Sequence, residues 1–274
     1  MMSSKTYHAW LLRFREYISY RESIWLLAHI TGNDHADIIT NIDKNVPDDI
    51  VPNFELAISK LTEGTPLPYI LGSSYFMNRK FFVSTDVMIP RPDTECLVSK
   101  ILELLGSDTK EKRILDLGTG SGIIAITIKK NFPQHIVWAT DYSPGALLIA
   151  RKNSAFHEAD INLSHGNWYE AVVGEKFDYI ISNPPYISPH DSHLIDLSHE
   201  PKSALVSHDE GFQDLEKIIS GANNYLYPEG QLIVEHGWQQ GFRCQYAFHE
   251  NGLTMVSTLK DYLFRDRITT GKSK

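Results

Sequence analysis

The sequence predicts an α/β protein in which a doubly wound sheet follows a small N-terminal helical bundle and a β-hairpin linker. Two patterns support this prediction. Apolar residues recur at helical spacing over residues 7–60, and short apolar runs alternate with helical patterns from residue 113 onward. The chain has 274 residues, 42% of them hydrophobic, which is enough to bury the cores of two unequal domains.

The helical bundle is expected over residues 1–73. Its apolar residues follow helical spacing in three groups, around Trp10, Ile24 and Phe54. Glycine, proline and their polar neighbours separate the helices and close the region, at residues 32–34, 47–49, 64–66 and 68. The bundle is either a packed appendage or a platform on which a substrate docks, and both roles are open at this point.

A β-hairpin is expected to link the bundle to the rest of the chain. After Gly72 the pattern changes to alternating aromatic residues, which predicts strands at 74–76 and 80–84 with a turn at 77–79. The linker as a whole is placed at 74–90. The second domain then covers 91–274.

The second domain is expected to hold a sheet with helices on both faces, because strands and helices alternate along it. The predicted strands are 113–117, 136–140, 161–164, 179–182 and 231–235. The predicted helices are 122–131, 144–153, 211–226 and 238–250. The final two strands, at 253–259 and 263–270, have no helix between them, so they are expected to form a terminal antiparallel hairpin.

The charge and cysteine content argue against several classes of protein. The net charge is −8, whereas a protein that holds duplex nucleic acid presents a basic surface, so DNA and RNA are disfavoured partners. The two cysteines, Cys96 and Cys244, lack the spacing of a disulfide framework or a thiolate metal site, which fits a reducing cytoplasm and no bound metal. No apolar run reaches the ~20 residues of a membrane span, so neither export nor anchoring is expected.

A glycine-rich loop follows the first strand of the second domain. Residues 116–122 read Asp-Leu-Gly-Thr-Gly-Ser-Gly and open the next helix, where glycines let a ligand approach the backbone. Asp141 stands just past the second strand, 19 residues after Gly122, where a carboxylate would accept both ribose hydroxyl hydrogens. The alternatives are a plain packing turn for the loop and an N-cap for Asp141, although Ser143 is as well placed to cap. A cofactor with an adenosine ribose is favoured, either NAD or S-adenosylmethionine.

The spacing of the glycines distinguishes these two cofactors. The loop lacks the G-x-G-x-x-G register of a dinucleotide site, because Ile123 stands three residues after Gly120. Preceded by Asp116, the loop resembles that of S-adenosylmethionine-dependent methyltransferases. This resemblance implies their seven-stranded sheet, whose antiparallel end matches the predicted terminal hairpin.

A second motif, Asn183-Pro184-Pro185-Tyr186, ends the apolar strand that starts at Phe177. Two prolines fix two φ angles and remove two N–H groups, so the Asn183 amide and the nearby carbonyls are held rigid at the end of the sheet. The alternative is an ordinary Asn-Pro turn with no role in substrate binding. The motif resembles the active-site turn of methyltransferases that modify planar nitrogens in adenine, cytosine or glutamine.

An amide nitrogen is a poor nucleophile because its lone pair is delocalised into the carbonyl. The Asn183 side-chain oxygen and the Pro184 carbonyl are expected to accept the two N–H groups of a substrate amide and so aim its lone pair at the methyl group. Tyr186 is expected to pack over the amide plane. The product then loses its proton after transfer, so no basic residue is needed beforehand.

Further segments of the sequence indicate which group of these planar-nitrogen methyltransferases the chain resembles. In order, the chain resembles the glutamine methyltransferases that modify peptide chain release factors at residues 66–72, 76, 81–83, 89–95, 166–169, 183–187, 200–201, 235–237 and 265–267. The resemblance is weakest over 1–60. It implies a cytoplasmic monomer that methylates the glutamine of a Gly-Gly-Gln sequence, with 91–274 as the catalytic domain and 1–73 as a substrate-docking domain.

The resemblance also implies the roles of individual residues. The cofactor-binding residues would be Gly118, Thr119, Gly120, Ser121, Gly122, Asp141, Asn167, Trp168 and Asn183. Substrate would contact Asn183, Pro184, Pro185 and Tyr186, of which Asn183, Pro184 and Tyr186 are catalytic. The family often has an acidic residue in place of Asn167, so the acceptor for the adenine amino group is kept without its charge.

Several alternatives accompany this interpretation. Arg91 and Glu95 form a structural ion pair or contact the cofactor, and the roles of Glu200 and His236 are open. Rival functions are a ribosomal-protein glutamine methyltransferase, a DNA adenine methyltransferase, which flips its base into such a pocket, and a non-catalytic binding module. The net charge opposes the DNA enzyme, and the intact Asn-Pro-Pro-Tyr turn opposes the non-catalytic module.

Overall fold

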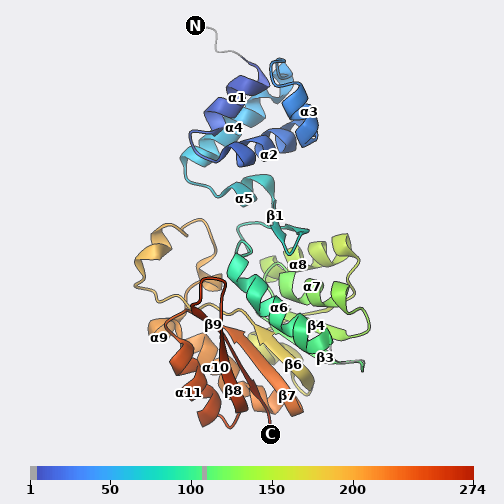
Figure 1. The fold of residues 1–274 in the computed structure, drawn as a ribbon, viewed down its shortest axis with the longest axis vertical. Helices are drawn as coiled ribbons and strands as arrows, with labels where there is room; N and C mark the ends of the chain where they lie inside the picture. The colour runs from blue at the N-terminus through green and yellow to red at the C-terminus, as the bar shows by residue number, and fades with distance from the viewer. Residues whose placement is uncertain (1–4, 107–109) are drawn as a thin grey trace. The chain divides into compact units, whose positions relative to one another are not determined.

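The computed structural model describes residues 5–106 and 110–274. The chain divides into two compact units, a helical unit, Met1–Ser73, and a sheet unit, Ser74–Lys274 (Figure 1). None of the helices in the described ranges combines the length and the apolar character needed to cross a membrane.

The helical unit is built around an aromatic core. Its described helices are α1 (Tyr7–Phe14), α2 (Tyr20–Thr31), α3 (His35–Thr40), α4 (Val51–Thr62) and α5 (Leu67–Leu71). The rings of Trp10 and Phe54 lie 4.9 Å apart between their centroids, and Phe14 packs against both. Ser19 and Glu22 form a capping box at the start of α2, so both side chains satisfy backbone N–H groups that a helix start leaves free.

Two helices of this unit depart from the sequence prediction. The breaker at 32–34 does separate two helices, but α3 starts immediately after it, because the Asp34 carboxylate accepts a hydrogen bond from the Asp37 N–H at 2.7 Å. The segment expected to close the unit as a loop instead forms α5, with Pro68 in its first turn. A proline fits there because the first N–H groups of a helix have no intrahelical partner.

Seven strands among the described residues of the sheet unit form one mixed sheet in the order β5-β4-β3-β6-β7-β9-β8. Their bounds are β3 (Arg113–Leu117), β4 (Ile136–Asp141), β5 (Asn162–His165), β6 (Phe177–Ser182), β7 (Leu226–Glu235), β8 (Thr254–Lys260) and β9 (Asp266–Lys272). Strand β9 runs antiparallel to both β7 and β8, and the other pairs are parallel. The predicted doubly wound fold with a terminal antiparallel hairpin is confirmed.

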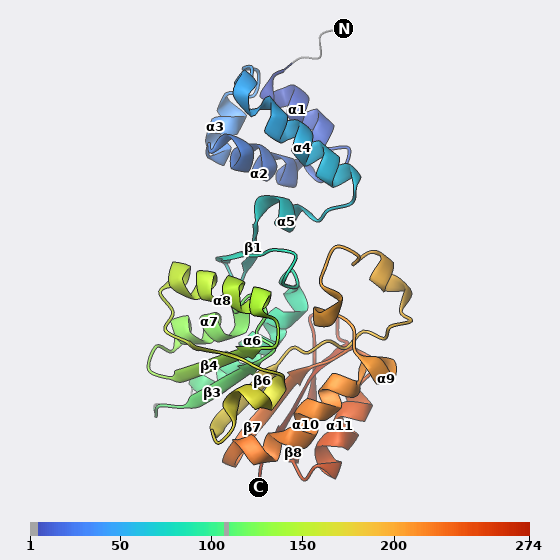
Figure 2. The same cartoon turned by 180° about the vertical axis from the view of Figure 1, so that it is seen from behind.

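Helices cover both faces of this sheet. They are α6 (Pro92–Gly106), α7 (Ile123–Asn131), α8 (Pro144–His157), α9 (His208–Gly211), α10 (Gln213–Tyr225) and α11 (Gly241–Glu250). In β3, Ile114 packs into the core beneath α6 and α7, whereas Leu115 and Leu117 pack into the core beneath α10 and α11. Figures 1 and 2 show α6 and α10 on opposite faces. In β3 the residues Ile114–Leu117 are all buried, as expected for a strand covered on both faces, although one of them is Asp116.

Several elements of the sheet unit differ from their prediction. Helix α6 lies in a stretch for which no helix was predicted. The predicted helix 211–226 begins at Gln213, because Gly211 at φ +84° ends the short α9, and it stops at Tyr225, because β7 already begins at Leu226. The hairpin strands are β1 (Ser73–Phe76) and β2 (Arg79–Phe82), so the turn is two residues long, and both of its residues have positive φ as a tight hairpin requires.

Candidate active site

The predicted site residues gather at the carboxyl ends of the parallel strands. The glycine loop follows β3, Asp141 ends β4, Asn167 follows β5 and Asn183 follows β6. Strand β3 lies between β4 and β6, so the strand order reverses beside it. Ligands of open α/β sheets bind at such a reversal, because the loops from neighbouring strands diverge there and leave a crevice.

The three glycines of the loop stand where a residue with a side chain would not fit well. Gly118, Gly120 and Gly122 have φ of +71°, +56° and +83°. A Cβ on Gly118 would lie 3.2 Å from Cζ3 of Trp168, and one on Gly122 would lie 2.9 Å from Cδ1 of Ile126. The loop therefore needs glycine both for its conformation and for the close approach of its neighbours.

Asp141 holds the glycine loop as well as facing the crevice. Its carboxylate accepts hydrogen bonds from the backbone N–H of Gly120 and of Ser143, both at 2.9 Å. Burial raises the pKa of Asp141 above its ordinary value, while these N–H groups act in the opposite direction. The alternative of N-capping does not apply, because the Ser143 hydroxyl caps α8 by accepting from the Ala146 N–H.

Asp116 is a second buried carboxyl beneath the loop. It accepts hydrogen bonds from the Thr119 hydroxyl at 2.6 Å and from the Ala125 N–H at 3.2 Å, both through Oδ2. No described residue provides a hydrogen-bond partner for Oδ1. Burial raises the pKa of Asp116 to about 7. This carboxyl therefore pins the loop to the start of α7.

A cavity of about 430 Å³ lies over the loop. Nine of the predicted site residues line it: Gly118, Thr119, Gly120, Ser121, Asp141, Asn167, Trp168, Asn183 and Pro185. Others that line it were not predicted, including Asp86, Val87 and Met88 after the hairpin and Thr94 on α6. Gly122, the N-cap of α7, is not among the residues that line the cavity.

A smaller cavity of about 60 Å³ shares part of this lining. Pro184 and Tyr186, the two predicted residues absent from the larger cavity along with Gly122, line the smaller one together with Arg91 and Leu197. Asn183 lines both cavities. Its side chain is therefore in reach of a ligand in either space.

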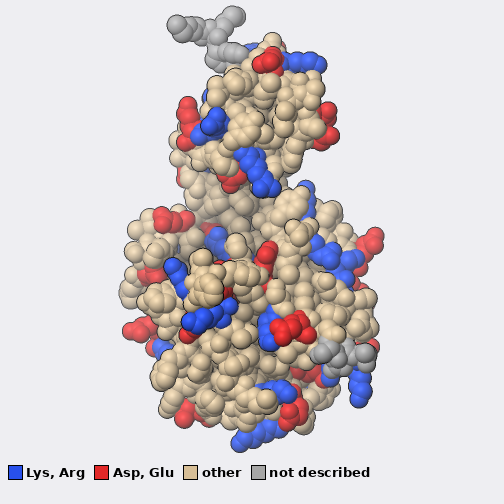
Figure 3. Space-filling model, in the orientation of Figure 1, with Lys and Arg blue, Asp and Glu red and all other residues tan. Residues whose placement is uncertain are grey.

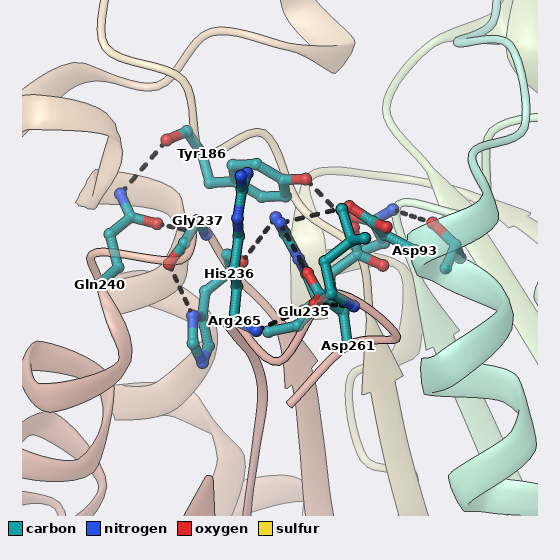
Figure 4. A network of polar contacts seen from close by, with 12 residues as sticks. Asp93, Tyr186, Glu235, His236, Gly237, Gln240, Asp261 and Arg265 are labelled. Atoms are coloured by element: carbon teal, nitrogen blue, oxygen red, sulfur yellow. Dashed lines mark hydrogen bonds and ion pairs between the residues drawn. The ribbon is translucent and has the colours of Figure 1, made fainter. Parts of the chain in front are cut away.

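The side chains of the turn have defined partners. The Asn183 amide nitrogen donates to the Thr94 hydroxyl oxygen at 2.9 Å, so the amide oxygen is directed away from Thr94. The Tyr186 hydroxyl donates to Oε1 of Glu235 at 3.1 Å, and burial raises the pKa of Tyr186. Figure 4 shows Tyr186 above Glu235, with Gln240 donating to the Tyr186 carbonyl oxygen.

The ion pair between Arg91 and Glu95, one of the two alternatives expected from the sequence, does not form. Arg91 instead pairs with Glu200, whose other oxygen accepts from the Ile89 N–H at 2.9 Å. Glu95 accepts from the Met77 N–H at 2.9 Å. None of these side chains lines the larger cavity, and Arg91 alone of the three lines the smaller one.

His236 lines neither cavity. Its ring lies 2.9 Å from the Gly237 carbonyl oxygen and 2.9 Å from the Thr269 hydroxyl, and burial lowers its pKa.

Comparisons with known proteins agree with this geometry. The family model of the methyltransferase small domain matches residues 93–200, and that of the PrmC N-terminal domain matches residues 13–72. Two solved structures share the fold of the sheet unit. The first is a methyltransferase from Pyrococcus furiosus, with a TM-score of 0.53 and 18% identity; the match covers 70% of this chain and 87% of that one. The second is a 16S rRNA methyltransferase from T. thermophilus, with a TM-score of 0.55 and 16% identity; the match covers 74% of this chain and 50% of that one.

Curated relatives extend over most of the chain. The release factor glutamine methyltransferase of Xylella fastidiosa (strain Temecula1) is 41% identical over 250 residues, which are 90% of this chain and 90% of the relative. That of Haemophilus influenzae is 37% identical over 265 residues, or 91% and 90% of the two chains, and that of Escherichia coli K12 is 37% identical over 256 residues, or 92% and 91%. With a shared methyltransferase domain and this identity along nearly its whole length, the chain belongs to the family of release factor glutamine methyltransferases.

Proposed function

We propose that this protein transfers the methyl group of S-adenosylmethionine to the side-chain amide nitrogen of the glutamine in the Gly-Gly-Gln sequence of peptide chain release factors. The observation that carries the proposal is the position of Asn183, which lines a cavity of cofactor size and a small cavity beside it. The curated relatives, which carry this activity in their names, support the same substrate.

The residues over the glycine loop fit an adenosine cofactor. The Asp141 carboxylate accepts the N–H groups of Gly120 and Ser143 through different oxygens and lines the cavity, where the lone pairs that the backbone does not use would accept ribose hydroxyls. Residues 118–121 line the cavity along the glycine loop, and Asn167 and Trp168 are on the cavity wall where adenine would lie. S-adenosylmethionine supplies an electrophilic methyl group on a sulfonium.

The Asn-Pro-Pro-Tyr turn would hold the glutamine amide. With its nitrogen on Thr94, Asn183 has its oxygen available to accept one substrate N–H, and the Pro184 carbonyl would accept the other. Tyr186 would pack against the amide plane and Pro185 would line the path to the cofactor. Because two prolines fix the backbone, little reorganisation is needed when the lone pair is aimed at the methyl group.

The helical unit would dock the substrate protein away from the chemistry. Binding energy from such remote contacts can position a reacting group that is itself small. The enzyme would act as a monomer in the cytoplasm, and its product would be a release factor adapted for translation termination.

DNA is a poor rival substrate on electrostatic grounds. The net charge is −8, and on the face drawn in Figure 3 the basic side chains are interspersed with acidic ones. This distribution lacks the continuous basic surface that duplex binding favours.

The test is incubation of the protein with methyl-labelled S-adenosylmethionine and purified release factor, followed by mass spectrometry of the labelled peptide. A release factor with Gln→Ala in the Gly-Gly-Gln sequence is the matched control. Parallel reactions contain duplex DNA and ribosomal proteins. Label on the glutamine amide supports the proposal, whereas label on DNA or on ribosomal proteins in preference to release factor overturns it.

A further inference from the structure

Behind the Asn183 turn lies a buried polar network centred on Glu235, the last residue of β7 (Figure 4). The Glu235 side chain is fully buried. Its Oε1 accepts a hydrogen bond from the Tyr186 hydroxyl at 3.1 Å, and its Oε2 has no hydrogen-bond partner among the described residues. The Thr94 hydroxyl and the Arg267 charge favour its ionised form, and the Asp93 charge opposes it.

Arg267 is itself held between two carboxylates. Its guanidinium lies 3.2 Å from an oxygen of Asp93 and 3.2 Å from an oxygen of Asp261, and it donates to the His236 carbonyl at 3.3 Å. These contacts fix the positive charge beside Glu235. This charge favours the ionised form of Glu235, while the ion pairs of Arg267 within 4.0 Å are with Asp93 and Asp261.

The direction of each hydrogen bond in this network follows from the charge of Glu235. An ionised carboxylate can only accept, so a Thr94 hydroxyl turned toward Glu235 gives it its one hydrogen. Thr94 then has only lone pairs for Asn183, and Asn183 must offer its NH₂ group, as the 2.9 Å contact from Nδ2 to Oγ1 shows.

We propose that Thr94, oriented by Glu235, is a positioning residue that keeps the Asn183 amide with its oxygen toward the substrate glutamine. This inference rests on the proposed function. The two ends of a carboxamide have nearly the same shape, so packing alone does not choose between them. In the flipped orientation the Asn183 NH₂ would face the substrate NH₂, and two donors cannot bond.

The first test removes the Thr94 hydroxyl at constant shape. Thr94→Val should lower kcat by roughly 2- to 12-fold, the value of one hydrogen bond, with a smaller change in the dissociation constant for S-adenosylmethionine. Thr94→Ser, which keeps the hydroxyl, should recover most of this rate. Thr127→Val makes the same change at a buried threonine of α7 that has no hydroxyl partner among the described residues, and it should leave kcat unchanged.

A double-mutant cycle separates positioning from a general effect on the fold. Because Thr94 acts through Asn183, Thr94→Val should cause no further loss in an Asn183→Ala background. An equal loss in both backgrounds would overturn the proposal, as would full activity of Thr94→Val in the wild-type background.

The pH profile gives a second readout. Burial raises the pKa of Glu235 to about 7, opposed by the Thr94 hydroxyl, Arg267 and the Tyr186 hydroxyl, and increased by Asp93. Below this pH the protonated carboxyl can donate to Thr94, whose hydrogen is then free to turn to the Asn183 oxygen. The rate should therefore rise with pH through about 7, and Glu235→Gln should be slower at high pH with a flattened acid limb. An unchanged limb in Glu235→Gln would count against the network.

NMR makes the result independent of the reaction. The side-chain NH₂ signals of Asn183, assigned by their loss in Asn183→Ala, should show contacts to Thr94 in the wild type and lose them in Thr94→Val. If the wild type does not methylate release factor yet shows these contacts and their loss, the function fails and the orientation stands. If it methylates release factor and the signals are unaffected in Thr94→Val, only the positioning role fails.

Discussion

Replacement of Asp116 by asparagine should change how the stability of the sheet unit depends on pH. The Asp116 side chain is fully buried, and burial raises its pKa to about 7, compared with about 3.9 in an unfolded chain. The folded state therefore binds the proton more tightly than the unfolded state does. Stability is greatest below the unfolded pKa and falls as the pH rises toward the folded pKa, because a buried carboxyl must then ionise.

The size of this effect follows from the two pKa values. Three pKa units correspond to a total loss of about 4 kcal/mol once the pH exceeds both values. Between about pH 5 and about pH 8 the loss is roughly 2 to 3 kcal/mol, because part of it has already occurred below pH 5. Asparagine cannot ionise, so Asp116→Asn should lack this portion of the pH dependence. Glu235, whose pKa is also raised to about 7, keeps its own share in both proteins.

Urea unfolding of both proteins at the two pH values tests this, with hydrogen exchange of the β3 amides used to report on the sheet unit alone. The difference in unfolding free energy between variant and wild type should shift by roughly 2 to 3 kcal/mol in favour of the variant at the higher pH. Asp160→Asn, at an exposed aspartate of the same unit, is the control and should show no such shift. A difference between Asp116→Asn and wild type that is the same at both pH values would refute the reasoning.

Three further predictions concern the site and the helical unit. Asp141→Ala should weaken S-adenosylmethionine binding by roughly 1.5–3 kcal/mol, the range for charge-assisted hydrogen bonds, and NAD should not compete; unchanged affinity in calorimetry would reject the ribose role. Asn183→Ala should lower kcat by ~10²–10³ with most cofactor affinity retained, and near-normal turnover would remove the turn from the mechanism. Removal of residues 1–73, which have a core of their own, should slow methylation of intact release factor far more than that of a short Gly-Gly-Gln peptide, whereas equal losses would point to a stabilising role.

The parts of the site that could be predicted are those that a single short stretch of sequence is sufficient to identify. The glycine loop and Asp141 follow directly after apolar strands, so their place at the sheet edge could be inferred from local sequence. Thr94 could not be found in this way. It lies on α6, whose apolar residues are interspersed with polar ones, and its contact with Asn183 joins residues 89 positions apart. The partner of Arg91 was missed for the same reason, because Glu200 is 109 positions away.

The shared wall between the two cavities has a consequence for inhibitors. Met88, Asn183 and Ala204 line both the cavity of about 430 Å³ and that of about 60 Å³. Consider a single molecule with an adenosine group in the larger cavity and a primary amide in the smaller one. The linker between the two groups would have to pass Asn183, and the distance across this shared wall would set the length of the linker. Such a molecule would discriminate against S-adenosylmethionine enzymes that lack the small cavity, because its amide would have no matching space in them.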